Sequence, residues 1–410
     1  MFIKNIVFGA LATVFTLVII IGSIFATNVY LGYRSYSTDL ELLKDLRVVR
    51  LREKLPNSTR IRTVSKQHLN NSDGLDPKKV THIRVDKNGF IMPSKVHENP
   101  DLSIVFLGGS TTASSFVDED NRFPYATAKY LEKDFGMKVN AYNGGQGGNH
   151  SMHSNINLYA KVIPLQPQIV VLMHNINDLA TLMIEGTYWN SNVSRKMIVS
   201  FQDFRAGNEI STHNRSMGES IFFQWFPHIA ETLREPIVTK DEWANKRGKK
   251  ALGIDKFYLV NQFKNSLRSF ITTARAWNIV PVLMTQPNRF TEKPDEIVRT
   301  TFKKFENEWG INYDDYRDLY LDFQKAIRAV AKENSIVLVD LGNKIQKNSR
   351  HIYDNVHLTD VGSLAVADEI RKTLSNIIEY QKDGTDPKVR IVEKVSMTQG
   401  SNIALDNSRN

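Results

Sequence analysis

A serine that follows two glycines is the first residue in this sequence whose setting suggests chemistry. Gly108 and Gly109 end an apolar run and precede Ser110. Two glycines allow a sharp turn at little steric cost, which would leave the serine at the start of the next helix. Backbone N–H groups at a helix start favour developing negative charge. Ser110 could therefore act as a nucleophile, although Ser is also a common helix cap.

An Asp and a His three positions apart form the second candidate. Asp354 and His357 lie in a polar segment that follows a short apolar run. In a loop, this spacing can place the carboxylate beside the imidazole, where it fixes the tautomer and stabilises the cation. A D-x-x-H spacing is common by chance, so the pair gains weight only together with other residues.

Two further polar segments could stabilise an oxyanion. One is the glycine-rich stretch 143–149, in which Gly148 would let the backbone approach a ligand closely. The other contains Asn177, whose side-chain amide could donate to an oxyanion or could simply form a turn. Both segments follow short apolar runs, as Ser110 does.

Other classes of site find little support in the sequence. The chain has no Cys, which excludes disulfides, thiolate nucleophiles and Cys-based metal sites. The glycine-rich stretch lacks the last Gly of the dinucleotide fingerprint and neither glycine-rich loop has a Walker lysine, which argues against a nucleotide-binding membrane protein. His150 and His153 have the spacing of metal ligands, but without obvious further ligands we expect no metal. The net charge of +9 is spread along the chain, so we expect no nucleic-acid partner.

After residue 100, short apolar runs alternate with longer amphipathic stretches. Continuous β-branched and aliphatic runs are typical of strands buried on both faces, and apolar residues three to four apart predict helices between them. The alternation predicts a parallel five-stranded sheet in a three-layer α/β/α sandwich. The candidate residues follow four of the strands, at the edge where active sites of such sheets lie. The predicted strands are Ser103–Leu107, Val139–Asn143, Ile169–His174, Ile279–Met284 and Ile336–Asp340.

Taken together, the four segments resemble the successive signature blocks of the SGNH/GDSL hydrolase family, in the family's order. The resemblance covers about residues 102–377, apart from a long insertion, and implies a flavodoxin-like sheet with esterase, lipase or acyl-transfer chemistry and no metal or other cofactor. The blocks are Gly108-Gly109-Ser110, the glycine loop ending at Gly148, Asn177-Asp178, and Asp354-Asn355-Val356-His357.

Three positions depart from related patterns. Gly109 stands where the family's name motif has Asp, as it does in the GGST-type members. Asn175 stands where the third block usually has Gly; Asn tolerates a positive φ better than most residues, so the turn can survive. Thr112 breaks the G-x-S-x-G elbow of ordinary α/β-hydrolases.

The resemblance also implies a role for each candidate residue. Ser110 attacks an ester carbonyl, His357 removes the serine proton, and Asp354 orients the imidazole. The backbone N–H groups of Ser110 and Gly148 and the side chain of Asn177 form the oxyanion hole. Water then releases the acyl group, which makes the protein a serine esterase acting on an acylated glycan or lipid. The alternatives are an acyltransferase that uses the same site and a catalytically inactive binding protein on the same fold.

An uncharged run near the N-terminus predicts a membrane anchor. Residues 6–26 have no charged side chain and match the roughly 20 residues that span a bilayer core. A cleaved signal peptide would have a shorter apolar region of ~7–15 residues, although Ile24 and Ala26 could imitate a cleavage site. We therefore expect a single-pass membrane protein anchored by residues 1–33. The Lys/Arg count beyond the run favours a cytoplasmic domain, but long domains often translocate regardless, and we expect the catalytic domain to be extracytoplasmic.

The remaining segments suggest the organisation of the chain. Residues 34–100 are polar and predict a stalk or peripheral segment, residues 101–380 the hydrolase domain, and residues 381–410 a polar tail. Within the hydrolase domain, residues 180–253 interrupt the alternation and are too long for an ordinary loop, so we expect a cap. Its aromatic residues, Trp189 and Trp225 among them, would form either the cap's own core or a wall for the substrate.

Overall fold

Five parallel strands form the centre of the structure, a computed structural model that describes residues 2–43, 46–190, 192, 195–201, 255–383 and 386–392. The strand order is β5-β4-β6-β8-β9, which confirms the predicted five-stranded parallel sheet. In chain order this is 2-1-3-4-5, the flavodoxin-like arrangement. The strands are β4 (Leu102–Gly108), β5 (Val139–Gly145), β6 (Ile169–Met173), β8 (Val280–Met284) and β9 (Val337–Val339).

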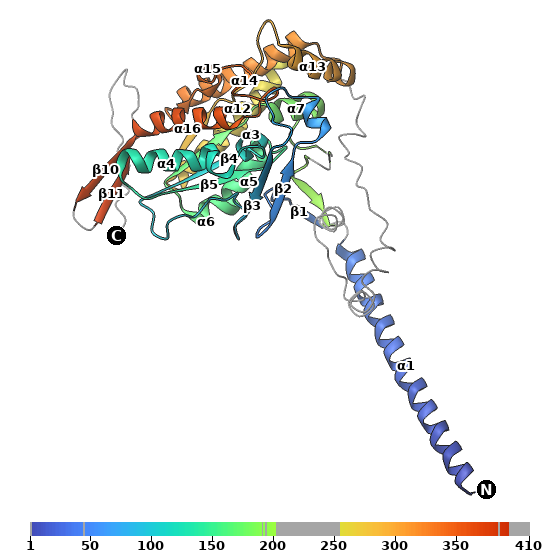
Figure 1. Cartoon of the computed structure of the whole chain (residues 1–410). Helices are drawn as coiled ribbons and strands as arrows, with labels where there is room; N and C mark the ends of the chain where they lie inside the picture. Colours follow the sequence, from blue (N-terminus) through green and yellow to red (C-terminus); the bar gives the residue numbers. More distant parts are fainter. Residues whose placement is uncertain are drawn as a thin grey trace. The chain divides into compact units, whose positions relative to one another are not determined.

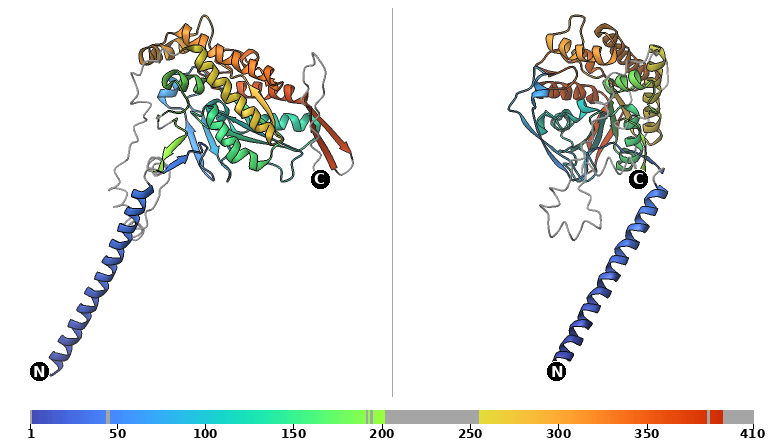
Figure 2. Two further views of the ribbon diagram at one scale, coloured as in Figure 1. Left: turned by 180° about the vertical axis from the view of Figure 1, so that it is seen from behind. Right: turned by 90° about the vertical axis from the view of Figure 1, so that its right-hand side faces the viewer.

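Helices cover both faces of the sheet (Figures 1 and 2). On one face α4 (Phe123–Phe135) packs against α16 (Asp360–Ser375), and their apolar residues join the side chains of alternate strand positions in one core. On the other face α12 (Lys256–Ala276) packs against α14 (Tyr313–Glu333), where the rings of Phe263 and Phe323 stack. The buried strands and the two helix layers form the predicted α/β/α sandwich.

Shorter elements connect these layers. They are α3 (Ser110–Ala113), η1 (Glu119–Asn121), α5 (Ser151–Asn157), the π-helical η2 (Leu158–Val162), α6 (Ile163–Leu165), α7 (Ile176–Glu185), α13 (Glu296–Trp309) and α15 (Leu341–Lys344). The helices α3, α5, α7 and α15 begin soon after the carboxyl ends of β4, β5, β6 and β9, at the edge of the sheet that carries the candidate residues. The helix α13 follows β8 after a longer connection.

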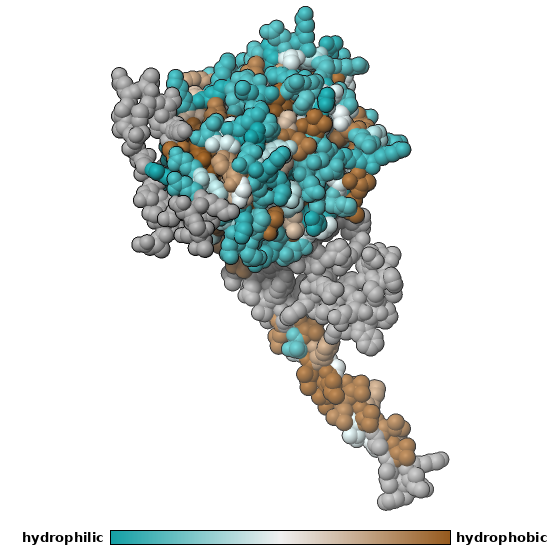
Figure 3. Space-filling view, turned by 60° about the vertical axis from the view of Figure 1, so that its left-hand side comes forward, coloured by the Kyte–Doolittle hydropathy of each residue, from teal (hydrophilic) through white to brown (hydrophobic). Residues whose placement is uncertain are grey.

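The chain divides into two compact units, and the N-terminal helix α1 (Phe2–Leu43) belongs to the smaller one, residues 1–50 and 198–245. Its segment Val7–Leu31 has a mean hydropathy of 2.5, and by length and composition it can cross a membrane. Figure 3 shows apolar side chains along the visible face of this helix. The same unit holds the antiparallel pair β1 (Arg47–Val49) and β7 (Ile198–Ser200).

The polar segment before the sheet contributes to the larger unit, residues 51–197 and 246–410. It contains the antiparallel hairpin β2 (Thr59–Thr63) and β3 (Val80–Arg84), with α2 (Lys66–Leu69) between the strands. The buried Arg122 at the start of α4 donates to the carbonyls of His82, Met92 and Ser114, which ties β3 to the end of α3. Buried Ile83, Val85 and Ile91 also pack against Ala113 of α3, so apolar contacts and these hydrogen bonds together attach the segment.

Parts of the expected cap and tail have defined structure. The helix α7 continues to Glu185, through the first residues of the expected insertion 180–253, and buries Leu182 and Met183. Residues 202–254, which include Trp225, lie outside the described residues. At the start of the expected tail, β10 (Ile378–Asp383) pairs with β11 (Asp386–Ile391), and residues 393–410 lie outside the described residues.

Candidate active site

Ser110 begins the short helix α3 directly after β4. The preceding Gly109 is its N-cap, and a Cβ added to Gly109 would lie 2.5 Å from Nδ2 of Asn177. Real Cβ atoms do not approach that closely, so a larger residue here would displace the amide. The glycine in place of the family's Asp therefore allows Asn177 to lie beside the serine turn.

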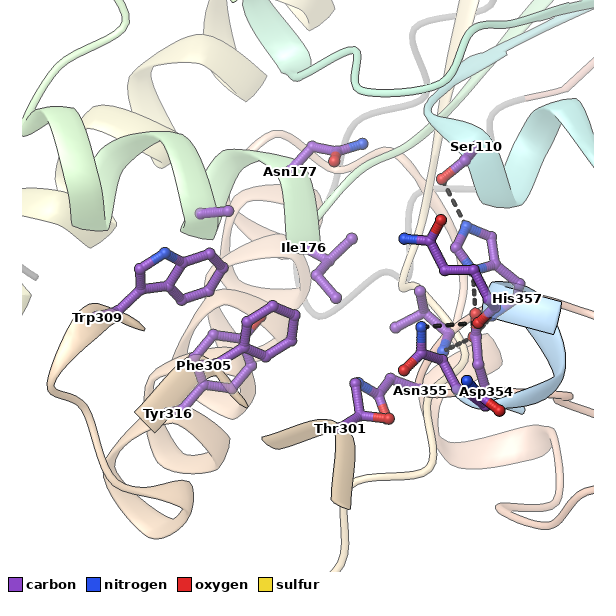
Figure 4. Close-up of a pocket in the computed structure, with 15 residues that line it drawn as sticks. Ser110, Ile176, Asn177, Thr301, Phe305, Trp309, Tyr316, Asp354, Asn355 and His357 are labelled. Carbon is purple, nitrogen blue, oxygen red and sulfur yellow. Dashed lines mark hydrogen bonds and ion pairs between the residues drawn. The ribbon is translucent and has the colours of Figure 1, made fainter. Parts of the chain in front are cut away.

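A continuous chain of hydrogen bonds joins the three predicted catalytic residues. Nε2 of His357 lies 2.7 Å from Oγ of Ser110, and Nδ1 of His357 lies 2.6 Å from Oδ2 of Asp354 (Figure 4). The other carboxylate oxygen, Oδ1 of Asp354, accepts from the backbone N–H groups of Val356 and His357, at 2.9 and 2.8 Å. The carboxylate is thus fixed by its own loop, and one imidazole nitrogen remains directed at the serine.

Burial and charge oppose each other in this pair. Burial disfavours the imidazolium, but the charge of Asp354 and its hydrogen bond outweigh burial, so the pKa of His357 is raised above its ordinary value. Burial likewise disfavours the carboxylate, but the charge and hydrogen bond of His357, together with the two backbone N–H donors, lower the pKa of Asp354. The geometry therefore stabilises the charged pair that forms when His357 takes a proton.

The loop that carries Asp354 and His357 is held on both sides. The ring of Tyr353 stacks on the imidazole, with centroids 5.6 Å apart. Thr359 caps α16 by accepting from the N–H of Gly362 at 3.1 Å. The next residue, Asp360, accepts from the N–H of Asp118 at 2.9 Å and pairs with Lys79, which connects the loop to the segments around it.

The predicted oxyanion donors lie in neighbouring segments. Nδ2 of Asn177 donates to the carbonyl of Asn149 at 2.9 Å, and Nη1 of Arg195 lies 3.3 Å from Oδ1 of Asn177. The same Arg195 atom donates to the carbonyl of Gly148 at 2.9 Å. Gly148 has a φ of +76°, a conformation that favours glycine. Because a guanidinium has only donors, Arg195 fixes the carbonyl end of the Asn177 amide. Sequence reasoning missed Arg195.

Ser110, Asn177, Asp354 and His357 open into one pocket with a volume of about 720 Å³, whereas Gly148 does not line it. Its remaining walls come from segments that the sequence did not connect with the site. Aromatic rings of α13 and α14 form one side, and Phe305 and Trp309 stack there with centroids 4.4 Å apart (Figure 4). Amide side chains occur elsewhere in the lining. The aromatic residues are Phe305, Trp309 and Tyr316, and the amide residues besides Asn177 are Gln67, Asn70, Asn71 and Asn355.

The described part of the expected cap adds no aromatic ring to the pocket lining. Trp189 of the expected cap is 65% exposed and does not line the pocket, and Trp225 lies outside the described residues. Among the described residues, the rings come from α13, which follows β8, and from α14. Phe305 and Trp309 are four residues apart in the sequence, and this spacing on an amphipathic helix was the signal that could have located them.

His150 and His153 have a structural explanation. His150 is the N-cap of α5, its N–H donates to Nδ1 of His153 at 3.2 Å, and the two rings lie 3.7 Å apart. Burial, followed by nearby positive charge, lowers the pKa of both residues well below the ordinary value. Within the part of the chain that the structure describes, no group of three or more His, Asp or Glu side chains is placed to hold a metal ion.

Comparisons with solved structures find distant neighbours. A catalytic mutant of Axe2, an acetylxylan esterase from Geobacillus stearothermophilus, is 13% identical, with a TM-score of 0.39 over 66% of this chain and 93% of that chain. A putative GDSL-like lipase from Parabacteroides merdae is 13% identical, with a TM-score of 0.40 over 68% of this chain and 97% of that chain. A comparison with curated proteins finds no match.

The family comparison is more direct. The profile of the GDSL-like lipase/acylhydrolase family matches residues 106–365, which is more than half of the chain. The matched range begins in β4, just before Ser110, and extends past His357 into α16. This confirms the resemblance found in the sequence, and the protein is a serine hydrolase that acts on ester bonds and belongs to the GDSL-like lipase/acylhydrolase family.

Proposed function

We propose that Ser110, His357 and Asp354 form the catalytic triad of this esterase. The supporting observation is the unbroken hydrogen-bond chain from the serine hydroxyl through the imidazole to the carboxylate. Nε2 of His357 accepts the hydroxyl proton while Oγ attacks the ester carbonyl. Asp354 holds Nδ1–H and stabilises the imidazolium. The imidazolium then protonates the departing alcohol, which leaves an acyl group on Ser110, and water activated by the same imidazole releases it.

The oxyanion of the tetrahedral intermediate is stabilised by three donors in this proposal. They are the backbone N–H groups of Ser110 and Gly148 and the side chain of Asn177. Asn177 uses one of its amide N–H bonds for the carbonyl of Asn149 and keeps the second for the oxyanion. Each preorganised donor of this kind is worth roughly 3 kcal/mol in the transition state.

Covalent labelling tests the nucleophile directly. A fluorophosphonate probe should attach to Ser110, because it reacts with a serine that a neighbouring base activates. The measurement is mass spectrometry of the labelled peptide in the wild type and in Ser110→Ala, with Ser115→Ala as the matched control. Labelling that persists in Ser110→Ala, or that is lost equally in Ser115→Ala, would contradict the assignment.

We further propose that the ester substrate is an acylated glycan. Stacked aromatic rings bind the apolar faces of sugar rings, and amide side chains exchange hydrogen bonds with hydroxyl groups. The pocket lining combines both types with no Lys or Arg among the described residues. A narrow apolar tunnel would instead suit a lipid chain, and the amide residues of the lining do not provide one.

Truncation of the aromatic wall should affect a glycan ester more than a small ester. In Trp309→Ala, kcat/KM for acetylated xylo-oligosaccharides should fall at least about tenfold, because the stacking surface is worth roughly 1–2 kcal/mol. The loss on 4-nitrophenyl acetate, which barely reaches α13, should be much smaller. Trp309→Phe should recover much of the activity, and Trp277→Ala, at the exposed end of α12, is the control. Equal losses on both esters would mean that Trp309 supports the fold instead.

We propose that α1 anchors the enzyme in a membrane, with the catalytic domain outside the cytoplasm. The support is the apolar segment Val7–Leu31. Burying about 20 such side chains in hydrocarbon is strongly favourable, so the protein should stay in the membrane fraction after high-salt and carbonate washes. Deleting residues 1–33 should yield a soluble, active enzyme. Release of the intact protein by salt alone would contradict an integral anchor, and protease protection in intact cells measures the orientation.

A further inference from the structure

A second, smaller cavity lies beside the glycine-rich segment that precedes Gly148. It has a volume of about 60 Å³, and its lining is notable for three basic side chains, Lys54, Arg60 and Arg62. None of these residues lines the catalytic pocket. The complete lining is Glu53, Lys54, Leu55, Ser58, Arg60, Arg62, Ile83, Val85 and Gln146.

The two arginines of β2 lie on the same face of the β2–β3 hairpin as two buried residues of β3, but they are themselves exposed. Arg60 pairs with Ile83, and Arg62 pairs with Thr81. Directly opposite residues of an antiparallel pair place their side chains on the same face. Because Ile83 and Thr81 are both 2% exposed, this is the face that packs on the body of the domain. Both arginines are nevertheless exposed, so an anion can reach their guanidinium groups from solvent.

Among the described residues, no carboxylate pairs with the three basic side chains of this cavity. The one carboxylate in the lining, Glu53, pairs with Lys161 at 2.8 Å. Across the described ranges, the side chains of Lys54, Arg60 and Arg62 form no ion pair. Burial, followed by the charges of Arg62, Arg60 and Arg122, lowers the pKa of Lys54 to about 8. The cations therefore repel one another in this structure, and a bound anion would relieve that repulsion.

A neutral donor also reaches the cavity. The side-chain oxygen of Gln146 is buried, and across the described part of the chain it has no hydrogen-bond partner. A side-chain amide can rotate so that its N–H groups replace its oxygen, and Gln146 can therefore donate to an anion held by the arginines.

Two interactions link residues around the cavity to residues around the catalytic site. The backbone N–H of Gln146 donates to the carbonyl of Gly108 at 3.1 Å, next to the serine turn. Burial lowers the pKa of His68, and the charge of Arg62 lowers it further. The charge of Asp354 raises the same pKa and that of His357 lowers it, so His68 interacts with both sites. From β2 the chain runs directly into α2, and Gln67, Asn70 and Asn71 of that region line the catalytic pocket.

We propose that Lys54, Arg60 and Arg62 bind a carboxylate of the glycan substrate, so that the enzyme acts on acylated acidic glycans in preference to neutral ones. The volume suits one small anionic group rather than a whole sugar ring, and the neighbouring 720 Å³ pocket accommodates the acylated residue. Arginine forks match carboxylate geometry and suit such recognition. The inference rests on the proposed esterase function, because it names the substrate of the same site.

A pair of substrates that differ in charge tests this site. Acetate release is measured from O-acetylated oligogalacturonides and from O-acetylated xylo-oligosaccharides, with wild type, Arg60→Gln/Arg62→Gln and the control Lys138→Gln. The ratio of kcat/KM for the acidic over the neutral substrate should fall about tenfold or more in the double variant, because two charge pairs with the substrate are lost. It should stay constant in Lys138→Gln, which removes an exposed charge elsewhere. The single variant Arg62→Lys should keep part of the preference.

A binding measurement separates this inference from the esterase proposal. Calorimetry with unacetylated oligogalacturonide and the Ser110→Ala protein reports binding without turnover. The Ser110→Ala protein should bind the oligogalacturonide as the wild type does. Adding Arg60→Gln/Arg62→Gln to it should weaken that binding about tenfold, which would support the site even if no ester is hydrolysed. An unchanged kcat/KM ratio together with unchanged binding would overturn the carboxylate site and leave the esterase proposal standing. Thermal unfolding of each variant confirms that the hairpin still folds.

Discussion

Replacing Ser110 with Ala should abolish ester hydrolysis and leave the fold intact. The substitution removes one oxygen that bonds to Nε2 of His357, and Ala fits the first position of α3 without strain. Without a nucleophile the acyl-enzyme cannot form, so kcat should fall by ~10⁴-fold or more. The measurement is kcat/KM for 4-nitrophenyl acetate together with the thermal unfolding midpoint, with Ser115→Ala as the control. Activity above roughly a tenth of the wild type in Ser110→Ala would refute the assignment.

Replacing Asp354 with Asn should lower the rate and move its pH dependence in a defined direction. Neutral His357 is the base, so kcat/KM rises as the pH increases through the pKa of His357, and that pKa is raised. The substitution removes the charge that raises this pKa, while burial, which lowers it, remains. The acid limb should therefore shift to lower pH than in the wild type.

The loss of rate has a separate cause in the Asp354→Asn variant. A neutral amide would not hold Nδ1–H as the carboxylate does, so the imidazole loses its preferred tautomer, and kcat should fall by ~10²–10⁴-fold. Asp368→Asn is the control, because it removes a carboxylate that pairs with Arg371 and Lys372 on the surface of α16. It should change neither the acid limb of the pH profile nor kcat. A limb that stays in place in Asp354→Asn would show that another group titrates.

The positions of the candidate residues were predictable because they depend on residues that are close to them in the sequence. The two glycines before Ser110 and the two-residue gap between Asp354 and His357 act through short-range sterics and loop geometry. The continuous apolar runs predicted the strands, because a strand that is buried on both faces carries apolar side chains at nearly every position. A parallel sheet brings the ends of such strands together, so residues far apart in sequence could be expected at one edge.

The walls of the site depend on contacts between segments that have no mutual signal in the sequence. The sequence predicted a stalk or peripheral segment for residues 34–100, and it gave no sign that Gln67 and Asn70 line the catalytic pocket. A small apolar cluster with Ile83, Val85 and Ile91 helps to attach this segment. Arg122 adds hydrogen bonds to backbone carbonyls, which carry no sequence pattern. The aromatic wall comes from α13 for a related reason: an amphipathic helix indicates which face is apolar, but not which cavity that face borders.

By itself, then, the sequence determined the five-stranded sheet and the polar segments that follow its strands. It also identified the residues of the proposed triad. These follow from local backbone preference and from the periodicity of apolar residues. Only the tertiary structure decided which side chains complete the pocket and where charge accumulates. Arg195 meets the Asn177 amide, and Arg60 and Arg62 converge with Lys54, because the packing of separate segments places them there. The surroundings of such long polar side chains depend on contacts between segments that are distant in the chain, and local sequence patterns do not encode those contacts.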